Sequence, residues 1–276
     1  MNAASVADKV IAITGGARGI GLAIATVLQG LGGKVAIGDI DESAVKEAGA
    51  RLGLKVCRGL DVTDRQSFTD FLDSVESELG PVDVVVNNAG IIAVGSAVDE
   101  SDAITRRVLD VNVYGVILGT KLAAQRMLPR GHGHIINIAS LGSVLPTQGI
   151  ATYCATKHAV LGYTDTVRME NRGSGVHFSA ILPTLTNTEM IAGIGHARGL
   201  KNAEPDDVAR AVAAVIAKPK SRVVVPRSMG VVASTQRLMP QRVSEALERL
   251  LGTGGVFTSE VEVDKRTSYA RRTGTS

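Results

Sequence analysis

Short apolar runs alternate with longer stretches of helical spacing along most of this 276-residue chain, and this alternation limits the possible folds. The runs are rich in Val and Ile, and several have apolar residues at consecutive positions rather than at every second one. Strands of that composition are buried on both faces, as in a parallel sheet covered by helices. Parallel neighbours need long, right-handed crossovers. The sequence therefore predicts a single-domain α/β fold with a doubly wound sheet of about seven strands.

The pattern also predicts where the elements lie. The expected strands cover residues 9–14, 34–38, 54–59, 82–87, 134–139, 176–182 and 222–225. The expected helices cover residues 19–30, 42–52, 64–79, 100–128, 151–172 and 205–217. No linker or repeat interrupts this pattern, so we expect one domain over residues 1–226. Residues 227–276 form an expected C-terminal extension, with a helix at about 228–251 and a flexible basic tail after it.

Charge and composition exclude several classes of protein. The net charge of +3 lies in the tail, where four basic residues accompany Asp264: Lys265, Arg266, Arg271 and Arg272. Only 3% of the chain is aromatic and Trp is absent, so nucleic-acid binding is not expected. Neither the cysteines nor the histidines have the spacing of metal ligands, and no metal site is expected. No transmembrane run or basic-then-apolar leader is apparent, so we expect a cytoplasmic protein.

A glycine-rich turn, Thr14-Gly15-Gly16-Ala17-Arg18-Gly19-Ile20-Gly21, follows the first expected strand and opens into a helix. Glycine permits a tight turn and lets backbone N–H groups approach a diphosphate. The strand before this turn and the helix after it indicate dinucleotide binding in a Rossmann-like fold. We predict five cofactor contacts here: Gly15, Arg18, Gly19, Ile20 and Gly21.

Asp39 ends the second expected strand, and its carboxylate can accept hydrogen bonds from the adenine ribose. A solvated turn acid is the alternative, because Asp41 and Glu42 follow closely. The guanidinium of Arg18 could bind the 2′-phosphate of NADP. Asp39 opposes this, because its carboxylate would either repel that phosphate or pair with Arg18. NAD is therefore the preferred cofactor, and NADP remains the alternative.

Tyr153 and Lys157 lie four residues apart on one expected helix, where side chains at that spacing are neighbours. Tyrosine titrates near pH ~10, and a nearby cation lowers the pKa of the phenol towards the range of a general base. The same spacing occurs by chance on many helices. Ser140 strengthens the case, because it ends the fifth expected strand at the edge where such sheets bind ligands.

Together these motifs resemble the short-chain dehydrogenase/reductase family over roughly residues 8–226. The glycine-rich turn matches the family's phosphate-binding turn, and Asn87-Asn88-Ala89-Gly90 matches its segment after strand four. Four residues match its catalytic positions: Asn112, Ser140, Tyr153 and Lys157. The resemblance implies further cofactor contacts by Asp61, Val62, Asn88, Ala89, Gly90, Tyr153, Lys157, Pro183, Leu185 and Thr188. Thr184 stands where the family usually has glycine, so the loop is expected to differ there.

The family's chemistry also follows from these side chains. Tyr153 would exchange a proton with the substrate oxygen while a hydride passes to or from the nicotinamide, and Ser140 would stabilise that oxygen. The resemblance implies that Lys157 lowers the tyrosine pKa and holds the ribose. It also implies that Asn112 anchors a proton-relaying water, and an amide that pins a helix kink is a compatible second role.

The expected substrate walls are apolar, with Ile92, Leu141, Leu145 and Met190 as candidates. The sequence thus favours an oxidoreductase for a largely apolar secondary alcohol or ketone. An NADPH-dependent 3-oxoacyl-type or carbonyl reductase is one alternative. A non-catalytic dinucleotide sensor is another, although it would not require all four catalytic positions. Family members commonly pair through the helices corresponding to 100–128 and 151–172, so a homodimer or homotetramer is expected.

Overall fold

The computed structural model describes residues 5–194, 202–230, 257 and 263–275. The strands are β1 (Val10–Thr14), β2 (Lys34–Asp39), β3 (Val56–Gly59), β4 (Val84–Asn87), β5 (Gly133–Ile138), β6 (Val176–Pro183) and β7 (Arg222–Val225). The α-helices are α1 (Gly19–Gly30), α2 (Glu42–Leu52), α3 (Arg65–Leu79), α4 (Asp102–Leu109), α5 (Gly115–Met127), α6 (Ala151–Glu170), α7 (Pro205–Ala217) and α10 (Val263–Thr273).

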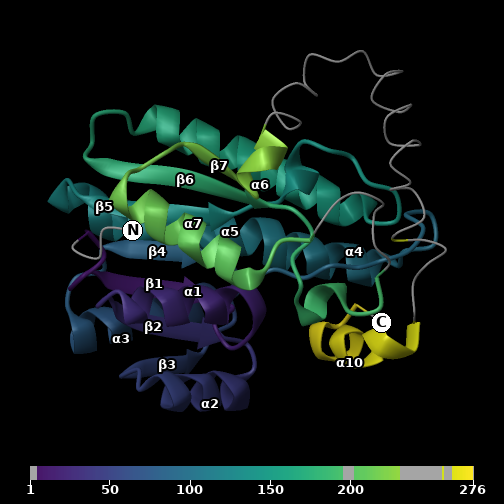
Figure 1. The fold of residues 1–276 in the computed structure, drawn as a ribbon, viewed down its shortest axis with the longest axis horizontal. Coiled ribbons are helices and arrows are strands. Elements are labelled where there is room, and N and C mark those ends of the chain that lie inside the picture. Colours follow the sequence, from purple (N-terminus) through teal and green to yellow (C-terminus); the bar gives the residue numbers. More distant parts are fainter. Residues whose placement is uncertain (1–4, 195–201, 231–256, 258–262, 276) are drawn as a thin grey trace.

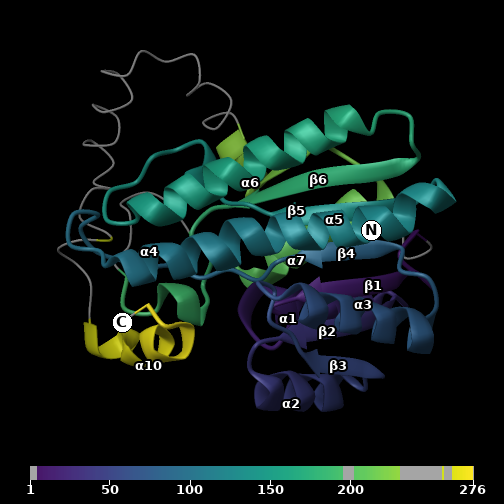
Figure 2. The same cartoon turned by 180° about the vertical axis from the view of Figure 1, so that it is seen from behind.

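The strands form one 7-stranded sheet in the order β3-β2-β1-β4-β5-β6-β7. Every pairing in it is parallel. Figures 1 and 2 show α1 and α7 over one face and α3, α5 and α6 over the other. The predicted doubly wound α/β fold is confirmed. The first and last residues of each predicted strand lie within two residues of the observed bounds.

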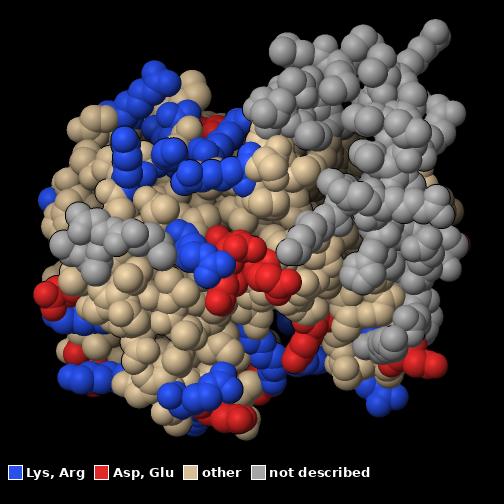
Figure 3. Space-filling model, viewed as in Figure 1, with Lys and Arg blue, Asp and Glu red and all other residues tan. Residues whose placement is uncertain are grey.

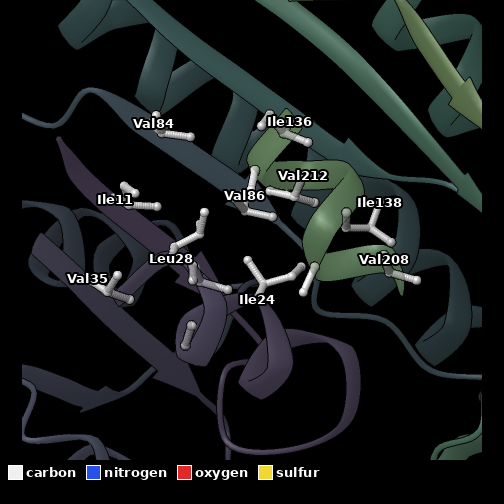
Figure 4. Packing of buried hydrophobic residues seen from close by; sticks show 14 of the residues in the cluster. Ile11, Ile24, Leu28, Val35, Val84, Val86, Ile136, Ile138, Val208 and Val212 are labelled. Atoms are coloured by element: carbon white, nitrogen blue, oxygen red, sulfur yellow. The ribbon is translucent and has the colours of Figure 1, made fainter. Parts of the chain in front are cut away.

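Alternating strand residues enter two separate cores, which explains why the strands have apolar residues at consecutive positions. In β1, Ile11 and Ile13 join the core under α1 and α7. Val10 and Ala12 of the same strand join the core under α3 and α5. Figure 4 shows the first of these cores, where α1 and α7 meet over the middle strands. Successive side chains of a strand point to opposite faces, so a sheet covered on both faces needs apolar residues throughout.

The helix predicted over residues 100–128 is interrupted. α4 ends at Leu109, a π-helical turn covers Asp110–Tyr114, and α5 begins at Gly115. π-helical turns in an α-helix often occur at functional sites.

The prediction of a flexible basic tail was wrong for residues 263–273, which form α10. Tyr269 in this helix is only 5% exposed, and such burial can stabilise a helix whose sequence is mostly polar. Most of the helix predicted at 228–251 lies outside the described residues, and the boundary at residue 226 stays a prediction. In the described part of the chain, no helix is long and apolar enough to cross a membrane.

Two isoleucines near the end of β2 offer a test of the core. Ile37 is fully buried, whereas Ile40, just after the strand, is 55% exposed. Ile37→Ala should lower the free energy of unfolding by about 2–5 kcal/mol, because it removes buried methyl groups and leaves a cavity. Ile40→Ala should change it by less than about 1 kcal/mol. Urea denaturation measures both values, and equal losses would contradict the observed packing of β2.

Candidate active site

The strand order reverses between β1 and β4, and hydrogen bonds join the loops that leave these two strands. The Thr14 hydroxyl oxygen accepts the backbone N–H groups of Asn88 and Ala89, both at 3.0 Å. The Asn88 side-chain amide donates to the carbonyls of Thr14, at 2.9 Å, and Gly15, at 3.0 Å. Ligands of doubly wound sheets bind at the carboxyl edge beside such a reversal. The Asn88 amide therefore fixes the border of the expected cofactor crevice.

The glycine-rich turn has the geometry that a diphosphate needs. Gly15 and Gly19 have φ values of 65° and 52°. A Cβ on Gly21 would lie 2.0 Å from the Gly15 carbonyl oxygen, so no side chain fits there. Arg18 precedes α1 without capping it through its side chain, and the first turn of α1 holds no acid. A helix start of this kind suits an anion, so the residues present fit a dinucleotide.

Two acids after β2 have different partners. Asp39 Oδ2 accepts the Ala17 N–H at 3.1 Å, and its Oδ1 accepts the Asp41 N–H at 3.2 Å. Arg18 pairs with Asp41 at 2.6 Å, so the alternative in which Asp39 pairs with Arg18 is not observed. Hydrogen bonds from the Ala44 N–H and the Arg18 guanidinium keep the pKa of Asp41 below its ordinary value.

The expected contacts from β3 and β4 reach the same edge of the sheet. Asp61 accepts hydrogen bonds from the N–H of Thr63, at 2.9 Å, and from its hydroxyl, at 2.6 Å. Val62 and Ala89 line one narrow cavity together with Thr14 and Asn87. These four lining residues therefore lie around the end of β1, and contacts of Asp61 and Val62 with the adenine stay a prediction.

The loop after β6 closes towards the glycine-rich turn. Pro183 ends β6, and the Thr184 N–H donates to the Val225 carbonyl at 2.9 Å. Asp8 is the one non-glycine residue with positive φ in the described part of the chain, so Thr184 adopts no such conformation. A Cβ on Gly19 would lie 3.2 Å from Thr188 Cγ2, so Thr188 lies next to the glycine-rich turn, and its contact with the cofactor stays a prediction.

Ser140, Tyr153 and Lys157 lie together where β5 meets the start of α6. Lys157 Nζ lies 5.6 Å from the centre of the Tyr153 ring and donates to the Ile138 carbonyl at 2.9 Å. Ser140 Oγ accepts the Gly142 N–H at 3.1 Å, and Ser140 is also hydrogen-bonded to Tyr153. The sequence prediction that these three side chains share one site is consistent with this placement.

Burial controls the protonation of this group. It raises the pKa of Tyr153 above its ordinary value, against the opposing effect of the hydrogen bond with Ser140. Burial also lowers the pKa of Lys157 to about 8. The sequence predicted that Lys157 would lower the tyrosine pKa, and here the net direction is upward. Loss of water around the phenol dominates, while the lysine ammonium is engaged by the Ile138 carbonyl.

Asn112 lies in the π-helical turn and is fully buried. Its Oδ1 accepts the Ile91 N–H at 2.8 Å, and its Nδ2 donates to the Ile91 carbonyl and the Thr156 hydroxyl. The amide thus joins the helix break to α6 and the loop after β4. A Cβ on Gly90 would lie 3.3 Å from Asn112 Oδ1 and 3.5 Å from Lys157 Nζ, so both polar groups lie next to the backbone of Gly90.

An apolar cluster, named here the pocket cluster, surrounds Tyr153. Its buried members are Ile92, Ile150, Cys154, Ile194, Phe257 and Tyr269, and Val94, Tyr153, Leu185, Met190 and Ile191 pack against them. Of the predicted substrate residues, Ile92 and Met190 belong to it. Leu141, buried beside Ser140, and Leu145 are not among its described members.

Sequence reasoning missed Tyr269, because it lies in a polar, basic tail. The one available signal was a lone tyrosine spaced three residues from Arg266 and from Arg272, in a chain that is only 3% aromatic.

Comparisons with known proteins agree with this geometry. A family model described as short chain dehydrogenase matches residues 9–199. The 2-(S)-hydroxypropyl-CoM dehydrogenase 3 of Xanthobacter autotrophicus is 39% identical over 188 residues, 66% of this chain and 74% of that protein. A 3-alpha-(or 20-beta)-hydroxysteroid dehydrogenase of Mycobacterium tuberculosis is 37% identical over 184 residues, 66% of this chain and 70% of that protein.

A longer relative and a solved structure add to this. The probable oxidoreductase EphD of Mycobacterium bovis is 34% identical over 259 residues, 85% of this chain. The match covers only 44% of EphD, so the chain spans less than half the length of that relative. The crystal structure of 3-ketoacyl-(acyl-carrier-protein) reductase from Brucella melitensis complexed with NADH aligns with a TM-score of 0.73 and 26% identity. The alignment covers 81% of this chain and 99% of that one.

Lys157→Met tests the buried ammonium through stability alone. The pKa of Lys157 is about 8 in the folded protein and 10.5 ordinarily, so between these values the unfolded chain binds more protons. The free energy of unfolding should therefore rise from about pH 8 to about pH 10. Between these two pH values, the free energy of unfolding of the wild type should rise by on the order of 2 kcal/mol more than that of Lys157→Met.

Urea denaturation at the two pH values measures this difference. Above pH ~10 the raised pKa of Tyr153 acts in the opposite sense, so the comparison stops there. Lys121→Met, at an exposed position of α5, serves as the control and should keep the wild-type pH dependence. The same pH dependence in Lys157→Met would contradict the assigned burial.

Proposed function

Because the chain belongs to the short-chain dehydrogenase family, we propose that it transfers a hydride between NAD(H) and a largely apolar secondary alcohol or ketone. The observation that carries this proposal is the meeting of Ser140, Tyr153 and Lys157 at the carboxyl edge of the sheet. Tyr153 packs there against a cluster of apolar side chains. That combination suits proton transfer to or from a substrate oxygen in a site with little water.

The residues proposed to hold the dinucleotide follow from the fit of the glycine-rich turn. The N-terminus of α1 would bind the diphosphate, and Asp39 would accept bonds from the adenine ribose. Asp61, Val62 and the segment Asn88–Gly90 would border the adenine and ribose, with Pro183, Leu185 and Thr188 on the nicotinamide side. When bound, the dinucleotide supplies or accepts the hydride.

Tyr153 is proposed as the general acid and base. Its raised pKa keeps the phenol protonated at neutral pH, which suits donation to a ketone oxygen as charge develops there. Ser140 Oγ accepts the Gly142 N–H, so the serine hydroxyl can direct its proton towards Tyr153 or the substrate oxygen. In the oxidation direction, the same phenol must first lose its proton, and the ammonium of Lys157 would then stabilise the phenolate.

Asn112 is proposed to act with Lys157. Oδ1 of Asn112 and Nζ of Lys157 both face the backbone at Gly90, which supports a water-mediated proton path between them. The three hydrogen bonds of the amide also hold the π-helical turn in place, so both roles expected for Asn112 are compatible.

The choice of NAD rests on the acids that follow β2. Arg18 already pairs with Asp41 at 2.6 Å, and this ion pair partly neutralises the positive charge of the Arg18 guanidinium. The carboxylate of Asp39 beside it would repel a 2′-phosphate. An NADPH-dependent 3-oxoacyl-type reductase remains the alternative, and it would require Arg18 to release Asp41.

The substrate class rests on the pocket cluster around Tyr153. Its members are apolar apart from the hydroxyl of Tyr269 and that of Tyr153 itself. The name of one relative, a hydroxysteroid dehydrogenase, describes a largely apolar alcohol, which supports the same class here. A homodimer or homotetramer is also proposed. Leu109, Tyr114 and Met169 are large exposed apolar residues on the helices expected at that interface.

Tyr153→Phe tests the proposed chemistry. The variant should lose at least about a hundredfold in kcat with a panel of apolar alcohols and ketones, because it removes the proton donor. Binding of NADH should persist. The absorbance of the reduced cofactor measures turnover, and Tyr163→Phe, on the same helix, is the control that should keep it. Dinucleotide binding without any turnover in the wild type would instead favour a non-catalytic sensor.

Asp39→Asn tests the cofactor choice. The wild type should bind NADH more tightly than NADPH, and loss of the carboxylate should reduce this preference about tenfold, since repulsion of the 2′-phosphate disappears. Fluorescence titration with both reduced cofactors gives the two dissociation constants. Asp70→Asn, on α3, is a control that should keep the wild-type ratio. Tighter binding of NADPH by the wild type would overturn the assignment of NAD.

A further inference from the structure

Tyr269 of α10 lies in the same apolar cluster as the proposed catalytic tyrosine. It is 5% exposed, and its neighbours in the cluster include Ile92, Met190 and Tyr153. The Ile92 N–H donates to its phenol oxygen at 3.0 Å. Its proximity also contributes to the raised pKa of Tyr153, and burial raises the pKa of Tyr269 itself to about 12.

Polar contacts fix α10 on the segment after β6. Arg266 is 7% exposed and donates to the carbonyl of Met190 at 2.9 Å. Burying a guanidinium costs free energy unless it is hydrogen-bonded, so this contact favours one position of α10 against the segment after β6. Arg272 pairs with Glu189 at 2.7 Å. The guanidinium carbons of Arg266 and Arg272 lie 5.2 and 5.7 Å from the centre of the Tyr269 ring, which adds cation–π attraction.

The same helix also reaches the cofactor side of the site. The charge of Arg272 contributes to the lowered pKa of Asp41, the partner of Arg18 in the glycine-rich turn. In Figure 3 the surface is hollowed between the main body of the molecule and the part that α10 forms. α10 therefore lies across the edge of the sheet at which both ligands are proposed to bind.

We propose that Tyr269 forms a wall of the substrate pocket and limits the length of the apolar group that can lie beside Tyr153. This rests on the proposed function, and it adds a residue from outside the region that the family model matches. The side chain is large, lies close to the guanidinium groups of Arg266 and Arg272, and accepts a hydrogen bond from the Ile92 N–H at its hydroxyl oxygen. A wall held in this way selects substrates by shape, because the pocket cannot widen without breaking those contacts.

A series of methyl ketones from butanone to decanone, reduced with NADH, tests the wall in the full-length chain. Tyr269→Ala should raise the ratio of kcat/KM for decanone to that for butanone about tenfold or more, since it opens space for several methylene groups. Tyr269→Phe keeps the ring and should keep the wild-type ratio. Val98→Ala, at a residue that is 92% exposed, should also keep it. Should α10 loosen in Tyr269→Ala, the wall is still removed and the ratio still rises.

A second measurement needs no turnover. The chain has no tryptophan, so Tyr269→Trp and Val98→Trp each carry a single tryptophan as a fluorescent reporter. With NADH present, decanone should change the emission of Tyr269→Trp saturably, and it should quench Val98→Trp only in proportion to its concentration. Circular dichroism and NADH titration verify that both variants are folded.

The outcomes separate the two proposals. Turnover with an unchanged ratio in Tyr269→Ala would overturn the wall while the proposed function stands. A saturable change in Tyr269→Trp without turnover of any ketone would support the wall and count against the proposed reaction. Emission of Tyr269→Trp that responds to decanone like that of Val98→Trp, together with no turnover, would overturn both.

Discussion

The hydrogen bonds between Thr14 and the loop that begins at Asn88 hold the functional edge of this molecule together. They join the ends of β1 and β4, between which the strand order reverses. The register of these two strands pairs Ile11 with Val84. The glycine-rich turn lies on one side of that junction, and the loop leading to Ile91 and Ile92 on the other. A shift in the pairing register of these two strands would separate the glycine-rich turn from the loop whose Ile91 and Ile92 N–H groups donate to Asn112 and Tyr269.

The proposed proton-transfer group shows how the fold supports an unfavourable arrangement. Lys157 is 4% exposed and meets a backbone carbonyl rather than an acid, so its charge is only partly compensated. The two cores on either side of the sheet provide the stability that offsets this cost. Burial gives the site a weakly acidic phenol and a lysine that titrates near neutrality, a pairing that water would not permit.

Much of the fold was predictable, because both-face burial leaves a plain pattern: residues 10–13 and 84–86 are apolar at every position. The closeness of Ser140, Tyr153 and Lys157 was predictable from their positions after the fifth strand and on the next helix, and their catalytic roles stay a proposal. The partner of Arg18 was not, since Asp39 and Asp41 lie almost equally close in sequence. The direction of the Tyr153 pKa depends on burial by distant segments. α10 escaped prediction because its docking relies on Arg266 and Tyr269 meeting residues far along the chain.

The hydrogen bond between Ile92 and Tyr269 joins residues 177 positions apart. Bringing such distant residues together costs chain entropy, which contacts formed earlier must already have reduced. The sheet and its flanking helices can therefore assemble, and the dinucleotide turn can take shape, before this last wall closes. During folding, the molecule would pass through a state whose cofactor edge is complete while the space beside Tyr153 still opens to water.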